Sequence, residues 1–549
     1  MSESPKPVVV VTPAAEIDYT RDFVALPREY GTRRYEARAD VQAIRAAVWD
    51  NLRQLDARTG FCSRIDGKPV ILKPNLVTVF HWLGTRGGDS PETTDPRVID
   101  AVVTFFQQYT RRIIIAESSG RGMPTAASFK IAGLDRLAKL RGVELTALEE
   151  QPVDRYLLPK ARVMREVVVP RLISAAVRGE AFFVSMPKLK TNLYTGVTLG
   201  FKNQMGVLSY NLRQRSHHHA INQKLVDLLY LLRPDLVLID GIVGGEGNCP
   251  APVEPVQSRV IISGNHAVET DRVAARMMGF DPAHIPLLQL ADENGFGDAR
   301  VEVAGAARVT PFRPADPALM GAWMQENFPN VRVLTGHNGG AACLPPAAGW
   351  LQAQENACRG GCQASTRYAF DMLYYEGKRR DFRLTVITGT GVEKNGRRVY
   401  YDAAGNEYSL QDIHRLDGKK LAVGACTRAL KDSVTRHIDG CMPFPNAPHM
   451  VVHQLSGTTC AVISPRNHFL LAGLVATLRA CERRKAILRT GQRIDTPLQW
   501  TDTPDLPRAF TAEEMRCDYI AEPFAPLTRA EIRALCAAEN RNVLATFFP

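Results

Sequence analysis

The sequence predicts an α/β protein with a layered, largely parallel sheet, flanking helices and a second, smaller α/β domain. Strand-length apolar runs alternate with amphipathic helical segments between residues 60 and 300. These runs are nearly all apolar, as expected of strands that are buried on both faces. Of the 11 cysteines, all but Cys62 and Cys249 lie from Cys343 onward, which distinguishes the C-terminal part of the chain.

A chain of 549 residues exceeds the usual size of one domain, so we expect more than one core. Residues 1–310 are predicted to form an α/β ligand-binding domain, and residues 311–334 a connector. A cysteine-rich α/β domain is expected at 335–491, followed by a C-terminal tail with a late helix at 492–549.

The first half of the chain alternates strands with helices. Apolar runs predict strands at 8–12, 69–77, 111–122, 143–148, 163–170, 182–187, 234–247 and 258–265. Helical spacing of apolar residues predicts helices at 41–55, 92–109, 128–140, 172–177, 221–232 and 266–280. Thr94 or Asp95 is the expected N-cap of the second helix, with Pro96 in its first turn.

The second half shows the same two patterns. Strands are predicted at 384–392 and 419–426, with a hairpin at 397–410 between them. Helices are predicted after Cys362, at 468–480 and at 529–539. These elements favour a second sheet with its own covering helices.

The charge balance is basic, at a formal net +11. The basic residues are mostly scattered arginines, without a nucleic-acid motif or a basic stripe interleaved with aromatics, so we expect no nucleic-acid partner. An anionic small molecule suits this balance.

No segment reaches the roughly 18 apolar residues that span a bilayer, and the N-terminus lacks a signal-peptide pattern. We expect a cytoplasmic protein without a membrane partner.

The stretch from Val184 to Leu208 is the densest source of ligand-binding residue types. It is predicted to be a loop leaving a strand end, rich in glycine, hydroxyl groups and lysine, a combination that suits an anion. A solvated lysine loop is the alternative. The candidate binding residues of this stretch are Lys188, Lys190, Asn192, Thr195 and Asn203, with Lys202 as a catalytic candidate.

Polar residues also follow three other predicted strands. Lys73 and Asn75 end one strand, Ser118 and Ser119 follow another, and Glu117, Asp240 and Glu246 are candidate general bases or metal carboxylates. In open α/β sheets, ligands bind at the carboxyl ends of strands. We therefore predict one composite site, in which the lysines neutralise negative charge.

The ordered blocks VILKPNL, TDPRVIDAVVTFF, IIIAESS, VSMPKLKTN, GVTLGFKNQMGVL, PDLVLIDGIVGGEG and ETDRVAARMMGF lie within residues 60–300. They resemble the prokaryotic family known as domain of unknown function 362. Members often carry iron–sulfur clusters, commonly through a ferredoxin-like module, so the resemblance implies redox chemistry. This chain departs from that arrangement, because it has no C-x2-C-x2-C-x3-C run.

One block has a second resemblance. GFKNQMGVL is similar to the glycine-lysine block of lactate racemase-type enzymes, in which a lysine covalently carries a nickel pincer nucleotide. Lys202 is the matching position. The rest of that family's pattern is not matched, which puts a covalent cofactor on Lys202 in doubt.

Four cysteines of the second half form a candidate metal site. Cys358 and Cys362 flank two glycines, Cys426 ends a predicted strand, and Cys441 lies between Gly440 and a proline-flanked loop. Four thiolates on glycine-rich loops fit a [4Fe–4S] cluster. These segments also resemble C-terminal segments attached to this family in other proteins. Structural zinc and ordinary buried cysteine are the alternatives.

The hypothesis from the sequence is an iron–sulfur-dependent redox enzyme, an oxidoreductase that acts on an anionic small molecule or cofactor. An electron-donor protein would be its partner. The first alternative is a non-redox isomerase, lyase or ligase with a structural zinc site. A ligand- or cofactor-binding protein without turnover is the second.

Overall fold

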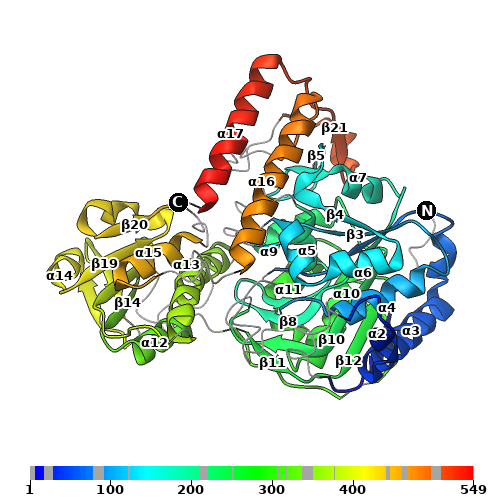
Figure 1. Cartoon of the computed structure of the whole chain (residues 1–549), viewed down its shortest axis with the longest axis horizontal. Helices are drawn as coiled ribbons and strands as arrows, with labels where there is room; N and C mark the ends of the chain where they lie inside the picture. Colours follow the sequence, from blue (N-terminus) through cyan, green and yellow to red (C-terminus); the bar gives the residue numbers. More distant parts are fainter. Residues whose placement is uncertain are drawn as a thin grey trace. The chain divides into compact units, whose positions relative to one another are not determined.

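The chain, drawn in Figure 1, forms two compact units. Each unit has its own hydrophobic core. The computed structural model describes residues 6–17, 29–77, 92–120, 124–208, 221–249, 253–306, 308–315, 318–336, 350–375, 377–402, 404–440, 446–459, 468–495 and 508–547. Unit 1 comprises residues 1–213, 222–314 and 475–540. Unit 2 comprises residues 214–221, 315–474 and 541–549.

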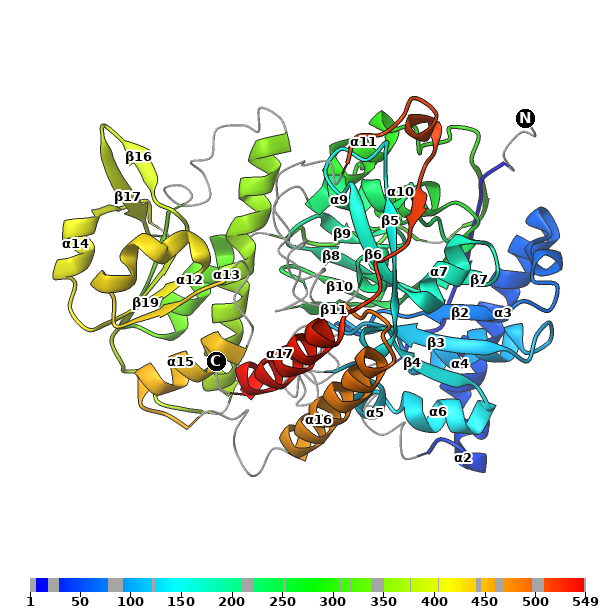
Figure 2. The same ribbon diagram turned by 90° about the horizontal axis from the view of Figure 1, so that it is seen from above.

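Unit 1 is built on an 11-stranded sheet whose main path runs β13-β1-β12-β10-β7-β2-β3-β4. The bounds are β1 (Val8–Pro13), β2 (Val70–Lys73), β3 (Ile113–Glu117), β4 (Glu144–Ala147), β7 (Phe182–Ser185), β10 (Leu236–Glu246), β12 (Val260–Gly264) and β13 (Glu302–Gly305). The strands from β10 through β7, β2 and β3 to β4 are parallel, and Figure 2 shows β2, β3 and β4 side by side. The predicted α/β class with a largely parallel sheet is confirmed.

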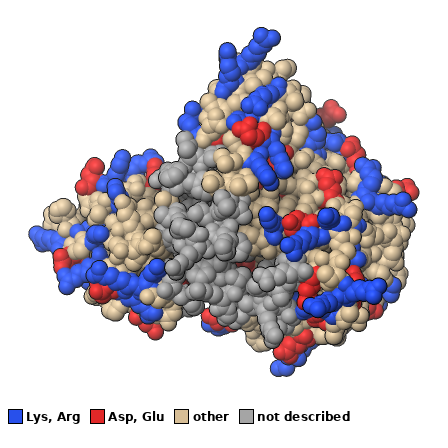
Figure 3. Space-filling model, in the orientation of Figure 1, with Lys and Arg blue, Asp and Glu red and all other residues tan. Residues whose placement is uncertain are grey.

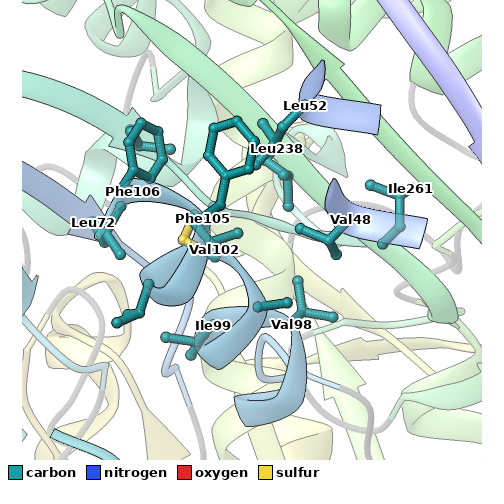
Figure 4. Close-up of a cluster of buried hydrophobic side chains, with 14 of the residues drawn as sticks. Val48, Leu52, Leu72, Val98, Ile99, Val102, Phe105, Phe106, Leu238 and Ile261 are labelled. Atoms are coloured by element: carbon teal, nitrogen blue, oxygen red, sulfur yellow. The ribbon is translucent and has the colours of Figure 1, made fainter. Parts of the chain in front are cut away.

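Helices cover both faces of this sheet. On one face, α3 (Ala39–Thr59) and α4 (Pro96–Phe106) bury an apolar layer that includes Leu72 and Leu238 (Figure 4). The α4 helix begins as predicted, because the Asp95 side chain caps it by accepting the Arg97 amide at 2.8 Å. On the opposite face lies α10 (Ala267–Met277).

The remaining helices and strands of unit 1 are short or peripheral. The helices are α2 (Arg33–Ala37), α5 (Thr125–Ile131), α6 (Leu134–Arg141), α7 (Arg171–Val177), α9 (Ile221–Leu228), α11 (Pro286–Glu293), α16 (His468–Arg489) and α17 (Arg529–Phe547). The helix predicted at 128–140 is divided between α5 and α6, because Gly133 has φ +71°. A three-stranded sheet contains β5 (Val153–Leu157), β6 (Glu166–Pro170) and β21 (Ile520–Glu522).

The stretch predicted as a lysine-rich loop is a buried hairpin, which corrects the sequence expectation. It forms β8 (Lys188–Asn192) and β9 (Gly196–Thr198), and a 3-10 turn follows at Lys202–Val207. The β8 strand pairs with β10, which continues past Asp240 as far as Glu246 and also pairs with β11 (Glu254–Val256). The extended β10 strand supplies backbone partners, so a polar segment is strand rather than loop.

Unit 2 holds a seven-stranded sheet of order β16-β17-β14-β15-β19-β20, with β18 paired to β17. Its strands are β14 (Val331–Thr335), β15 (Leu384–Thr388), β16 (Val392–Lys394), β17 (Arg397–Tyr401), β18 (Glu407–Ser409), β19 (Lys419–Val423) and β20 (Arg436–Ile438). The helices are α12 (Ala318–Asn327), α13 (Trp350–Tyr375), α14 (Leu410–Arg415) and α15 (Asn446–Ser456). Residues 311–334, expected as a connector, thus include α12 and most of β14, which pairs with β15.

Charged side chains are mixed on the visible surface. Figure 3 shows Lys and Arg interspersed with Asp and Glu, so this face does not gather the net positive charge into one stripe. Among the described helices, none is both long and apolar enough to cross a membrane.

Asp271 of α10 anchors the turn that follows the hairpin. Its carboxyl group accepts the backbone N–H of Gly200 at 2.5 Å and that of Phe201 at 3.1 Å. Burial raises the pKa of Asp271 to about 8. The carboxyl group of the folded protein is therefore largely protonated at neutral pH, while in the unfolded chain it is ionised.

Replacing Leu238 with alanine should lower the free energy of unfolding by about 2–5 kcal/mol, because its side chain is fully buried between the sheet and α3–α4. Urea denaturation measures this change. Leu478 is 49% exposed on α16, so Leu478→Ala is the matched control. Equal losses in the two variants would contradict the packing described.

Asp271→Asn should gain stability relative to the wild type as the pH rises from about 4 to about 8. Between these values the folded protein holds a proton that the unfolded chain releases, so the wild type loses about 1.4 kcal/mol per pH unit. Thermal unfolding at pH 5 and pH 8 measures the difference. Asp66→Asn, at an exposed turn of unit 1, should show no such trend. If the difference in stability between the wild type and Asp271→Asn does not depend on pH, the raised pKa of Asp271 is refuted.

Candidate functional site

Lys73 and Glu117, the last residues of β2 and β3, form a buried ion pair. The Lys73 ammonium also donates to the side-chain oxygen of Asn203 at 3.0 Å and to the carbonyl of Pro74 at 2.9 Å. The Asn203 amide donates in return to the Lys73 carbonyl at 3.1 Å. The 3-10 turn that carries Asn203 is thereby fixed to the end of β2.

Gly206 lies against this ion pair. A Cβ atom at position 206 would stand 2.6 Å from Lys73 Nζ and 3.2 Å from Glu117 Oε1, so a side chain there would displace the ammonium. Asn203 and Gly206 are three residues apart in a 3-10 turn, which places both on the side that faces Lys73. The glycine is therefore required by the close approach of the turn.

A second buried ion pair joins Lys188 of β8 to Asp240 of β10, at 2.8 Å between Nζ and Oδ2. The same carboxylate oxygen accepts the backbone N–H of Asp95 at 2.8 Å. Burial alone would raise the pKa of Asp95, but the adjacent Arg97 guanidinium lowers it. The polar end of α4 is thus tied to the centre of the sheet.

Lys190 is held differently. Its ammonium donates to Asn75 Oδ1 at 3.2 Å and to the Glu92 carbonyl at 2.8 Å, and it has no carboxylate at ion-pair distance in the described part of the chain. Asn75 also donates to Asn203 Oδ1 at 3.3 Å, which connects Lys190 to Lys73. Burial lowers the pKa of Lys190.

The structure thus brings most of the predicted strand-end residues together, in one hydrogen-bonded network around Lys73 and Lys190 and in the Lys188–Asp240 pair, which β8 connects to that network. We call the two groups together the lysine cluster. Its members are Lys73, Asn75, Glu117, Lys188, Lys190, Asn203 and Asp240. Ser118 follows Glu117 directly and is buried, as is Lys202 at the start of the 3-10 turn. This arrangement can neutralise an anion and hold protons on carboxylates and amines away from bulk water.

The predicted residues Asn192 and Thr195 serve the hairpin turn instead. The Asn192 side-chain oxygen accepts the backbone N–H groups of Tyr194 and Thr195 at 3.0 and 3.1 Å, and it also accepts the Thr195 hydroxyl. The Thr195 hydroxyl is also 2.7 Å from the Val197 carbonyl. Such local bonds are turn chemistry, so the structure shows these two side chains in the hairpin turn, and ligand binding by them stays a prediction.

Ser119 and Glu246 also have structural partners. The Ser119 hydroxyl donates to the Leu76 carbonyl at 2.6 Å, joining the ends of β2 and β3. Glu246, at the far end of β10, pairs with the Arg313 guanidinium at 2.7 Å and accepts the Arg313 amide at 2.8 Å. In the described residues Glu246 makes no contact with the lysine cluster, so the structure does not place it as a catalytic group there.

Three residues near the cluster were absent from the predicted site. Asp95 was interpreted only as a helix cap, although its amide binds Asp240. Thr198 pairs with Lys190 across β8 and β9, and the Glu92 carbonyl accepts from Lys190. Thr198 could have been identified from its pairing with Lys190 in the hairpin. The sequence did not indicate this pairing, because the segment was predicted to be a loop.

In unit 2, two of the four predicted thiols come together at Gly424. A Cβ atom on Gly424 would stand 2.9 Å from Cys362 Sγ and 3.3 Å from Cys426 Sγ. Gly424 has φ +111°, which glycine alone adopts readily. Cys362 lies within α13 rather than at its opening, because the helix already begins at Trp350.

The other two predicted thiols lie outside the side chains that the structure describes. Position 358 is one turn before Cys362 on α13, and position 441 follows Gly440. The Gly440 carbonyl accepts the Ala425 amide at 3.0 Å, and the His437 Nε2 lies 3.2 Å from the Gly424 carbonyl. Among the described side chains, no group of three or more His, Cys, Asp or Glu could hold a metal ion.

Comparison with known proteins covers the part of unit 1 that carries the lysine cluster. Residues 70–276 match the family described as domain of unknown function (DUF362). The thylakoid-associated protein sll1697 of Synechocystis sp. is 25% identical over 250 residues, which are 43% of this chain and 71% of that protein. No solved structure matches. From β2 to α10, the chain is therefore similar to a family that is defined by sequence and has no assigned chemistry.

Proposed function

We propose that this chain is an iron–sulfur-dependent redox enzyme that acts on an anionic small molecule or cofactor. The observation that carries the proposal is the approach of the Cys362 and Cys426 sulfurs to Gly424. Both sulfurs lie within 3.3 Å of one point, where any side chain would collide with them. Thiols gathered around a glycine turn are a donor set that suits a cluster.

Cys358 and Cys441 would complete a ligand set of four thiolates. Position 358 belongs to the same helix as Cys362, and position 441 follows a glycine that is hydrogen-bonded to the Cys426 turn. A [4Fe–4S] cluster bound there would supply one-electron transfer. His437, near the Gly424 carbonyl, would help to hold the backbone of this turn in place.

The lysine cluster supports the anionic half of the proposal. Lys73, Lys188 and Lys190 are all buried in the lysine cluster of unit 1, and lysine is suited to neutralise an anion as a mobile point charge. Glu117 and Asp240 would act as proton acceptors, since each is already hydrogen-bonded to a lysine that could return a proton. Lys202, at the start of the 3-10 turn, would contact the same ligand.

The partners and the location belong to the same proposal. An electron-donor protein would reduce the cluster, and the protein would act in the cytoplasm. The relative from Synechocystis is named as thylakoid-associated, and that description applies to that protein.

A non-redox isomerase, lyase or ligase is the second candidate, because the same thiols could hold structural zinc. A ligand-binding protein without turnover is the third.

Full-length protein purified without oxygen should contain iron and acid-labile sulfide in equal amounts. Cys362→Ser and Cys426→Ser should each lower the iron content severalfold, because each removes a ligand from the set. Metal and sulfide analysis of the purified variants measures this. Cys517→Ser, at an exposed cysteine of unit 1, is the matched control and should keep the iron content of the wild type.

Two results would reject the redox proposal. Stoichiometric zinc without iron or sulfide would favour the non-redox alternative with a structural zinc site. Full iron and sulfide content in both variants would mean that any cluster is held by other residues.

A further inference from the structure

Lys190 differs from the two other lysines whose bonds define the lysine cluster. Lys73 and Lys188 each have a carboxylate partner. Lys190 instead donates to two neutral oxygens, the side-chain oxygen of Asn75 and the backbone carbonyl oxygen of Glu92. It is 1% exposed. An ammonium group has three N–H donors, so the third has no acceptor in the described part of the chain. A buried charge in this state is unfavourable without a counter-ion.

Thr198 is the cross-strand partner of Lys190. The two residues are directly opposite in the antiparallel pair of β8 and β9, so their side chains lie on the same face, with Cβ atoms about 4.5–5.5 Å apart. The Thr198 hydroxyl is buried and makes no hydrogen bond to any residue that the structure describes. Since buried hydroxyl groups are normally satisfied, this one also lacks an expected partner.

A third buried polar group lies nearby in the sequence. Among the described residues, neither amide atom of Gln204 has a hydrogen-bond partner, although the side chain is fully buried. Gln204 follows Asn203, whose side chain contacts Lys73. The unsatisfied side chains of Thr198 and Gln204, together with a buried lysine that has no carboxylate partner, indicate that the protein alone does not complete this region.

We propose that Lys190 and Thr198 bind one oxyanion group of the substrate, a phosphate or a carboxylate, and that binding places a proton on Lys190. The proton comes from the solvent. The resulting ammonium donates its third N–H to the oxyanion, and the Thr198 hydroxyl donates a second hydrogen bond. This inference rests on the proposed anionic substrate and is independent of the iron–sulfur cluster.

The two hydrogen bonds of Lys190 are consistent with a neutral amine in the ligand-free protein. A neutral amine has two N–H donors, which match the two neutral acceptors on Asn75 and Glu92, and it keeps its lone pair for the incoming proton. Burial is the largest influence on Lys190 and lowers its pKa, which favours this neutral form before the anion arrives. The Cys249 thiol and the Glu92 and Glu117 carboxylates act in the opposite direction, while the Lys188 ammonium adds to the effect of burial. Anion binding should therefore weaken as the pH rises.

Calorimetric titration of the full-length protein with inorganic phosphate, pyrophosphate and citrate tests the proposal. At least one anion should bind with uptake of up to one proton, counted from the heats in two buffers of different ionisation enthalpy. Above the pKa of the free amine, the affinity should fall about tenfold per pH unit. The phosphate and citrate arms distinguish the two oxyanion classes.

Two substitutions that nearly keep the size of the side chain test the roles of Lys190 and Thr198. Lys190→Met should abolish anion binding while the protein keeps a cooperative thermal transition, because it removes the group that takes up the proton. Thr198→Val should weaken binding about tenfold and keep the fold. Lys130→Met, at an exposed lysine of α5, is the control and should bind like the wild type. Iron and sulfide contents should be unchanged in all three variants, which separates this test from that of the cluster.

Several outcomes overturn the inference. The first is that none of the three anions binds the wild type, and the second is that binding occurs without proton uptake. The third is that Lys190→Met binds the anion as tightly as the wild type does.

Discussion

The burial of lysine side chains at the strand ends is the constraint on which unit 1 depends. An ammonium group taken out of water is costly unless it is paired and hydrogen-bonded, so the sheet must bring carboxylates to it. Glu117 of β3 reaches Lys73 of the adjacent β2, and Asp240 of β10 reaches Lys188 of the adjacent β8. Removing one partner would leave a buried charge, at a cost of about 3–5 kcal/mol. The strand order therefore places each carboxylate beside its lysine, and the ion pairs in turn stabilise that strand order.

Glycines allow the backbone to approach these pairs. Gly206 leaves room for the Lys73 ammonium, and a Cβ atom on Gly241 would stand 2.9 Å from Leu189 of β8. The glycines of β10 lie within the strand, in agreement with the strand predicted at 234–247. Their lack of a side chain lets the β8 strand pack across β10. The lysine cluster thus combines charge pairing with close backbone contact, and Asp271 fixes the turn beside it.

The sequence predicted the parts of the fold that depend on apolar pattern. The buried strands, α3, α4 and the convergence of Lys73, Glu117 and Asp240 follow from apolar runs and from the rule for parallel strand ends. The β8–β9 hairpin could not be predicted, because KLKTN is polar and becomes strand only through tertiary partners such as Asp240. The pairing of Glu246 with Arg313, 67 residues away, was equally hidden. In unit 2, spacing suggested the thiols, but only the turn at Gly424 shows that Cys362 and Cys426 approach one another.

A crystal structure of the full-length protein grown with the anion that binds most tightly tests the central claim most directly. The claim is that the lysine cluster is completed by a ligand rather than by the protein. The account predicts electron density for the anion within hydrogen-bond distance of Lys190 Nζ and Thr198 Oγ1, with the Lys73–Glu117 and Lys188–Asp240 pairs intact. A carboxylate of the chain itself bound to Lys190 in that crystal, with the anion elsewhere, would contradict the account.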